Sequence, residues 1–168
     1  MKDGKILISD DTLIIDNPSK VMIQMMKDMV EDALQYSEDP NTKVAAVIFD
    51  NKGRNSIGIN RSSRNKELGD LWEKRDGNYF DTKYPWIVHA EVAAISCFLK
   101  KYGVAPIDSV LLVSLFPCHE CAKLISEVGI NHVIYLDDKY NGTPGNIIAK
   151  DILQTAGVKV YKYEDLIK

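Results

Sequence analysis

The sequence has no long hydrophobic run and no pattern of a secretory signal. No stretch approaches the roughly 20 apolar residues that a membrane-spanning helix needs. The first residues, MKDGK, lead into a short apolar run that acidic side chains interrupt. We therefore expect a soluble, cytoplasmic protein without a membrane partner.

Cysteine is scarce, and positive charge is not in excess. The three cysteines, Cys97, Cys118 and Cys121, are an odd number, so a disulfide framework is the least expected use of them. Lys and Arg number 21 against 24 Asp and Glu, which gives a formal net charge of −3. Because nonspecific binding of nucleic acids depends mostly on cationic contacts to phosphates, a nucleic acid partner is not expected. A local cluster of cations could still bind a single phosphate.

The length and composition indicate one compact unit. The chain has 168 residues, 45% of them hydrophobic and 27% charged, which predicts a single domain over residues 1–168. A chain of this size buries roughly 68 to 70% of its unfolded surface and does not need a metal merely to fold. Any metal that it holds is therefore expected to serve chemistry.

Helical and strand-like patterns alternate along the chain, which predicts a layered α/β domain. Helices are expected over residues 18–37, 89–101, 118–128 and 145–155, and strands over residues 44–49, 55–60, 110–116, 133–136 and 159–163. Residues 61–86 form a polar, irregular segment that is long for a loop inside a compact domain. This segment and the loop 137–144, which follows a strand, are expected to line a site.

The residues suited to chemistry lie in two short segments, HAE at residues 89–91 and PCHEC at residues 117–121. The order H-x-E and then P-C-x-x-C is the signature of zinc-dependent nucleobase deaminases. Cys118 and Cys121 are three positions apart, so a helix would place both sulfurs on one face, within reach of one ion. His89 completes a set of three ligands, and a tetrahedral zinc with three protein ligands keeps one position for water.

Glu91 is expected to be the catalytic residue, because it would lie beside the ion without having to bind it. We expect it to take a proton from the water, deliver it to the ring nitrogen and later protonate the departing ammonia. A C-x-x-C pair alone is also common in structural zinc and redox sites. A structural site would need a fourth ligand, and a helical rotation of about 100° per residue points His119 away from the face that the cysteines share.

Two other side chains with possible chemistry are left out of the site. His132 stands near the start of an expected strand and is predicted to be partly exposed. Cys97 follows the apolar pattern of its helix and is predicted to be a small core residue.

Two longer runs, DTKYPWIVHAE at residues 81–91 and LFPCHECAKLI at residues 115–125, closely resemble the deoxycytidylate (dCMP) deaminases of the zinc-dependent cytidine deaminase superfamily. The resemblance implies a three-layer α/β/α fold with a central mixed five-stranded sheet. It also implies one catalytic Zn²⁺, hydrolysis of dCMP to dUMP with release of ammonia, and a homo-oligomer, often a hexamer.

The resemblance further implies contacts to the nucleotide. Asn60 matches an asparagine that contacts the sugar, Tyr140 matches an aromatic residue near the pyrimidine, and Ala90 is expected beside the substrate. A turn residue and a surface aromatic side chain are the alternative interpretations of Asn60 and Tyr140. The phosphate is expected near polar and cationic side chains that could equally be solvated: Asn41, Lys43, Arg61 and Arg64.

Two departures from the family pattern leave alternatives open. Family members usually have Asn where this chain has Ala93, so a hydrogen-bonding group near the nucleotide is expected to be missing. Regulated members often carry GYNG where residues 58–61 read GINR, in a segment that helps form the site of dCTP activation and dTTP inhibition. Allosteric control therefore stays open, as does the use of dCTP or a 5-substituted dCMP as substrate. An RNA base deaminase and a nonenzymatic subunit are less favoured, because the charge is acidic and Glu91 is present.

Overall fold

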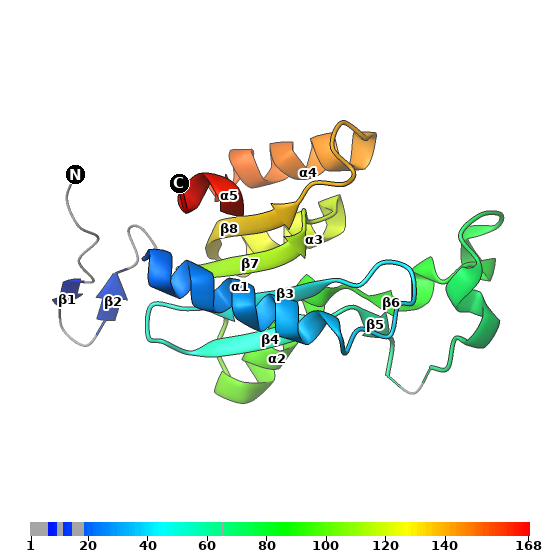
Figure 1. The fold of residues 1–168 in the computed structure, drawn as a ribbon, viewed down its shortest axis with the longest axis horizontal. Helices are drawn as coiled ribbons and strands as arrows, with labels where there is room; N and C mark the ends of the chain where they lie inside the picture. Colours follow the sequence, from blue (N-terminus) through cyan, green and yellow to red (C-terminus); the bar gives the residue numbers. More distant parts are fainter. Residues whose placement is uncertain (1–6, 10–11, 15–18, 65) are drawn as a thin grey trace.

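The computed structural model describes residues 7–9, 12–14, 19–64 and 66–168, and its centre is a mixed sheet of five strands (Figure 1). The strands are β3 (Ala45–Phe49), β4 (Asn55–Ile59), β7 (Ser109–Leu115), β8 (Ile130–Asp137) and β9 (Lys159–Lys162). Their order is β4-β3-β7-β8-β9, with β3 antiparallel to both of its neighbours and the last three strands parallel. The expected mixed sheet is confirmed.

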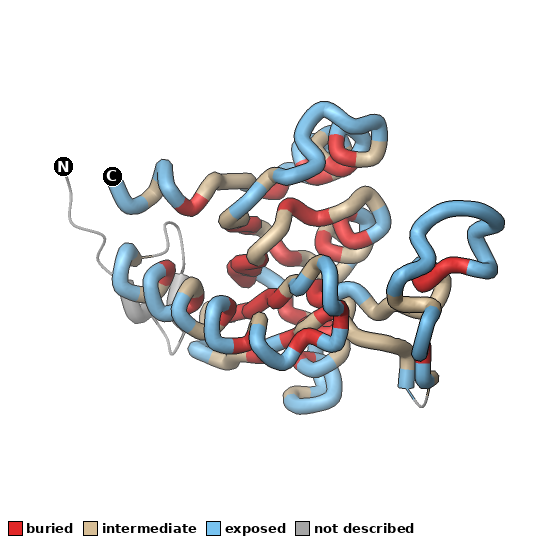
Figure 2. The backbone as a smooth tube through the Cα atoms, turned by 45° about the vertical axis from the view of Figure 1, so that its right-hand side comes forward, coloured by how far each residue is buried: buried red, intermediate tan, exposed pale blue. Residues whose placement is uncertain are grey.

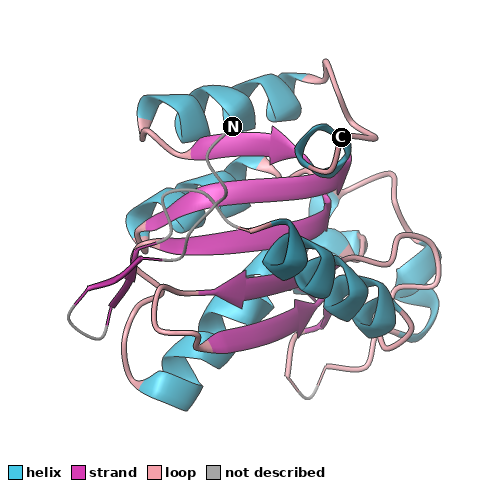
Figure 3. Ribbon diagram, turned by 60° about the vertical axis from the view of Figure 1, so that its left-hand side comes forward, coloured by secondary structure: helices cyan, strands magenta, loops and turns pink. Residues whose placement is uncertain are grey.

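Helices cover both faces of this sheet, which makes three layers (Figure 3). One face carries α2 (Ala90–Tyr102), α3 (His119–Glu127) and α4 (Pro144–Thr155), and the other carries α1 (Lys20–Leu34) and α5 (Tyr163–Leu166). Alternate side chains of a strand point to opposite faces. In β3, Ala46 and Ile48 accordingly pack in the α2–α3–α4 core, whereas Ala45 and Val47 pack in the α1 core. Figure 2 shows that the buried parts of the backbone gather in the interior and the exposed parts on the outside.

The first helix is shorter at both ends than the expected range 18–37. Ser19 caps α1, because its hydroxyl accepts a hydrogen bond from the backbone N–H of Met22 at 3.2 Å. The expected first residue, Pro18, lies outside the described residues, as does the N-terminal segment MKDGK. No helix in the described part of the chain is both long and apolar enough to cross a bilayer.

Residues 61–86 contain more local structure than the sequence predicts, and they project beyond the sheet (Figure 1). The segment holds β5 (Arg61–Ser62) and three short 3₁₀ helices at Gly69–Glu73, Tyr79–Asp81 and Tyr84–Trp86. β5 pairs antiparallel with β6 (Ile87–Val88), which leads directly into α2. A further two-stranded ribbon, β1 (Leu7–Ser9) with β2 (Thr12–Ile14), was not predicted either.

The predictions for His132 and Cys97 are wrong. β8 begins earlier than expected, at Ile130, so His132 lies inside the strand, is buried and stacks on the ring of Tyr161. Cys97 is exposed: its helix α2 packs on β4, and β4 is the edge strand of the sheet that the described residues form.

Candidate active site

The three expected metal ligands come together in space. The Nδ1 atom of His89 lies 3.4 Å from the Sγ atom of Cys118 and 3.4 Å from that of Cys121. Bond lengths of about 2.3 Å for Zn–S and 2.1 Å for Zn–N in a tetrahedral site would separate sulfur from nitrogen by about 3.6 Å. Zinc therefore fits this donor set with little rearrangement. Among the described residues, no other His, Cys, Asp or Glu joins the cluster, and His119 in particular does not.

Two helix N-termini position these ligands. His89 is the N-cap residue of α2, and Cys118 is the N-cap residue of α3. Cys121 follows in the first turn of α3 and is buried. The free N–H groups and the dipole of a helix N-terminus favour negative charge, which suits thiolate ligands.

Without a metal, the pKa values of the two cysteine thiols shift in opposite directions. The hydrogen bond with Cys121, together with the His89 ring, lowers the pKa of the Cys118 thiol to about 4. The same bond and burial raise the pKa of the Cys121 thiol. One thiolate is therefore already present at neutral pH, and a bound zinc ion would deprotonate the second cysteine.

Glu91 lies in the first turn of α2, in the same cavity as the cluster. It is 4% exposed, and this burial raises the pKa of its carboxyl group. A carboxyl group with a raised pKa is suited to taking up and releasing protons near neutral pH.

The cavity has a volume of about 380 Å³ and is large enough for a small ligand. It draws its walls from the region before β3, the end of β4, the projecting segment, the α2 and α3 N-termini and the loop that leads to α4. Its lining includes Asp39, Thr42, Asn60, Arg75, Lys83, Tyr84, Ala90, Pro117, His119, Tyr140, Thr143 and Asn146. Both segments expected to line a site, 61–86 and 137–144, contribute to it.

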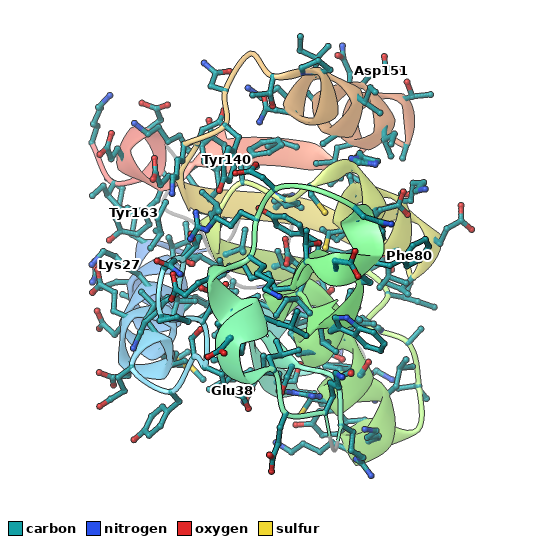
Figure 4. The ribbon with its side chains drawn as sticks, turned by 90° about the vertical axis from the view of Figure 1, so that its right-hand side faces the viewer. Lys27, Glu38, Phe80, Tyr140, Asp151 and Tyr163 are labelled. Atoms are coloured by element: carbon teal, nitrogen blue, oxygen red, sulfur yellow. The ribbon has the colours of Figure 1, made fainter. Side chains whose placement is uncertain are left out.

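Three expected nucleotide contacts, Asn60, Ala90 and Tyr140, line this cavity. Asn60 is buried, and its side chain holds the preceding loop: Oδ1 accepts from the N–H of Val44 at 2.8 Å, and Nδ2 donates to the carbonyl of Thr42 at 2.8 Å. Tyr140, labelled in Figure 4, lies between β8 and α4 and is 45% exposed.

The expected phosphate contacts do not reach the cavity. The side-chain amide of Asn41 donates to the carboxylate of Glu73 at 3.3 Å, and Lys43 and Arg64 are exposed away from the cavity lining. Arg61 lines a separate open groove between β4 and α2.

The cations that do line the cavity, Arg75 and Lys83, were missed. Lys83 is buried, and its Nζ atom lies 2.6 Å from Oδ2 of Asp39. Lys83 could have been predicted, because the DTKYP run that contains it lies shortly before the HAE segment of the zinc motif. Arg75 stands in an irregular segment that offers no pattern from which its position could be predicted.

The substitution at Ala93 does not affect the lining of this cavity. Ala93 lines the groove between β4 and α2 instead, close to Gly58. The side chain at position 93 therefore belongs to the wall of that groove and not to the lining of the zinc cavity.

A three-layer α/β/α domain with a His-Cys-Cys cluster at two helix N-termini and a buried glutamate beside it defines a zinc-dependent hydrolytic deaminase. The sequence matches the model of the cytidine and deoxycytidylate deaminase zinc-binding region over residues 19–137, and the chain belongs to this family.

Named relatives agree with this membership. Human deoxycytidylate deaminase is 36% identical over 132 residues, which cover 77% of this chain and 72% of the human one. The probable deoxycytidylate deaminase of Drosophila melanogaster is 39% identical over 134 residues, which cover 76% of this chain and 64% of the fly protein. A crystal structure of dCMP deaminase from the cyanophage S-TIM5 in complex with dCMP and dUMP matches with a TM-score of 0.68 and 25% identity, over 87% of this chain and 99% of that one.

Proposed function

We propose that the protein hydrolyses dCMP to dUMP and ammonia in the supply of pyrimidine deoxynucleotides. The observation that carries the proposal is one cavity whose lining combines His89 and Cys118 of the metal cluster, Glu91 and two cationic side chains, Arg75 and Lys83. The relatives named above are deoxycytidylate deaminases, and one solved relative holds dCMP and dUMP.

The chemistry follows from the residues of the site. His89, Cys118 and Cys121 would hold the zinc ion, which would lower the pKa of a water ligand to about 7 and so would supply a nucleophile at neutral pH. Glu91 accepts the proton of that water and delivers it to the ring nitrogen of cytosine. The hydroxide left by that water adds to C4 of the ring. Glu91 then moves the proton of the new C4 hydroxyl group to the amino group, so that the C4–N bond breaks, ammonia leaves and the C4 carbonyl of uracil forms.

We assign contacts along the nucleotide from the cavity lining. One hydrogen of the Asn60 amide is not used by the Thr42 carbonyl and can donate to a sugar hydroxyl. The Tyr140 ring can cover the pyrimidine, and Ala90 lies against the base. Arg75 is assigned to the phosphate, because no carboxylate of the described residues pairs with it and a guanidinium group suits phosphate geometry. The charge of Lys83 is already balanced by Asp39.

The assignment of Arg75 predicts a defect that depends on the phosphate. Arg75→Gln should raise the KM for dCMP by about 10- to 100-fold, because a charge-assisted hydrogen bond is lost. Turnover of deoxycytidine, which has no phosphate, should not change. Arg64→Gln is the matched control, since Arg64 is exposed and does not line the cavity. Equal KM values for dCMP in both variants would remove Arg75 from the phosphate site.

The substrate proposal is tested with cytidine, deoxycytidine, CMP, dCMP, 5-methyl-dCMP and dCTP, followed by ultraviolet absorbance. We expect the highest kcat/KM with dCMP. Preference for dCTP, or for a nucleoside without phosphate, would contradict the proposal, and so would release of ammonia from tRNA but not from dCMP. Sigmoidal kinetics that dCTP relieves would establish allosteric control.

We also propose that residues 1–168 form one domain, which acts in the cytoplasm as a homo-oligomer, in hexameric form, with no nucleic acid or membrane partner. The projecting segment supports self-association, because Tyr79 and Phe80 are 56% and 72% exposed. Phe80 is labelled in Figure 4. The net charge of −3 argues against a nucleic acid partner. Sedimentation velocity should show one species larger than the 18.9 kDa chain, and a monomer would contradict this proposal.

A further inference from the structure

Asn146 occupies an unusual position in the wall of the zinc cavity. It lies in the first turn of α4, is 6% exposed and lines the cavity. Its Nδ2 atom donates to Oδ1 of Asp138 at 2.7 Å. The other oxygen of Asp138 pairs with Nζ of Lys150, also at 2.7 Å. Lys150 donates in addition to the side-chain oxygen of Asn141 at 2.7 Å.

This network decides which way the Asn146 amide faces. An ionised carboxylate can only accept hydrogen bonds, and the ion pair with Lys150 favours the ionised form of Asp138. The amide nitrogen of Asn146 must therefore face Asp138, and Oδ1 is not part of that contact. That oxygen is buried and has no hydrogen-bond partner among the described residues. A buried acceptor without a partner is costly, so it calls for a donor.

Building on the proposed function, we propose that Asn146 Oδ1 accepts a hydrogen bond from an uncharged donor of the bound nucleotide and so contributes to substrate specificity. The donor is an amine or a hydroxyl group. A phosphate is not suited to this position, because its oxygens are acceptors and the charge of Asp138 lies close by. The cytosine 4-amino group, a hydroxyl group on a C5 substituent and the ribose 2′-hydroxyl group are the three sources of such a donor.

Binding constants separate this role from a structural one. Binding is measured by calorimetry in proteins that carry Glu91→Gln, so that the substrates are not consumed. The double variant Glu91→Gln/Asn146→Ala is compared with the single variant Glu91→Gln. Three pairs of ligands compare the presence and absence of each donor: dCMP with dUMP, 5-hydroxymethyl-dCMP with 5-methyl-dCMP, and CMP with dCMP. In the first pair the 4-amino donor is replaced by a carbonyl acceptor, and N3 gains a hydrogen. In at least one pair, Asn146→Ala should weaken the ligand that has the donor about tenfold relative to its partner. The affected pair identifies the source of the donor.

Asn141→Ala is the matched control. It makes the same chemical change in the same network, but Asn141 is exposed and does not line the cavity. We expect Asn141→Ala to leave all three ratios within about twofold of the parent. If Asn146→Ala weakens every ligand by one factor, or none, the proposal is overturned. The proposed function itself fails if the unaltered enzyme does not turn over dCMP, and this result is distinct from the binding ratios that test Asn146.

Discussion

Asp39 and Lys83 form an ion pair at the wall of the zinc cavity, with both side chains 5% exposed. Lys83→Met would leave the Asp39 carboxylate buried without its partner, and we expect the free energy of unfolding to fall by about 3 to 5 kcal/mol. Lys162→Met is the control, because Lys162 pairs with Glu164 on the surface. Loss of this exposed pair should lower the free energy of unfolding much less than loss of the buried pair. Urea denaturation measures both variants, and equal losses would show that burial of the first pair is unimportant.

The same pair should affect stability in acid. Burial alone would raise the pKa of the Asp39 carboxyl, but hydrogen bonds from Lys83 and from the backbone N–H groups of Asn41 and Thr42 outweigh it and hold the pKa below the usual 3.8. A lowered pKa in the folded state stabilises the protein above the unfolded pKa, and this contribution disappears as the pH falls through the folded pKa. Asp39→Asn should therefore show a shallower loss of stability below about pH 4 than the parent. Parallel curves of unfolding free energy against pH would contradict this.

At the scale of single residues, the cluster of His89, Cys118 and Cys121 could be predicted from the sequence, whereas the place of Arg75 in the cavity lining could not. Close spacing within two short segments fixes where His89, Glu91, Cys118 and Cys121 lie, because each segment begins a helix. A phosphate contact depends instead on how loops fold over the cavity. Arg75 lines the cavity although it stands in an irregular segment. Asn41, which precedes β3, donates a hydrogen bond to Glu73 instead and does not line the cavity.

The contact between β4 and α2 depends on a glycine. Among the glycines that the structure describes, Gly58 lies closest to the backbone of a neighbouring element. A Cβ atom on Gly58 would lie 2.2 Å from both the Ala90 carbonyl oxygen and the Ala94 amide nitrogen. Gly58→Ala should therefore lower the free energy of unfolding by at least about 3 kcal/mol. Gly145→Ala is the matched control, since a Cβ there would meet only His119 Nδ1, at 3.5 Å. Thermal unfolding should separate the two, and a Gly58→Ala protein as stable as the control would contradict the packing.

Elements with strong periodic patterns were predicted well, and short elements were not. All five strands of the central sheet and α1 to α4 were expected, with ends displaced by a few residues. The expected last strand, 159–163, ends one residue early, because Tyr163 begins α5 and donates from its hydroxyl to Gln24 of α1. Such ends depend on tertiary contacts, which a local pattern does not contain. The pairing of β5 with β6 is equally nonlocal.

At the scale of the whole molecule, zinc should link activity to stability. Cys118→Ser should lose bound zinc, dCMP turnover and part of the thermal stability, because a ligand that binds only the folded state stabilises it. Cys97→Ser is the control, since Cys97 is exposed and lies outside the cluster. Metal analysis and melting curves should show the control unchanged. If a chelator removed the zinc without loss of turnover, the metal would have no role in the reaction.

The most direct test of the account is the yield of dUMP and ammonia from dCMP by the zinc-loaded protein and by its Glu91→Gln variant. The unaltered protein should release one ammonia for each dUMP formed. Glu91→Gln should keep its zinc and its melting temperature but lose turnover by about 100- to 10,000-fold, since proton transfer by a positioned side chain contributes that much. Unchanged turnover in the zinc-loaded variant, or no ammonia from the unaltered protein, would contradict the account.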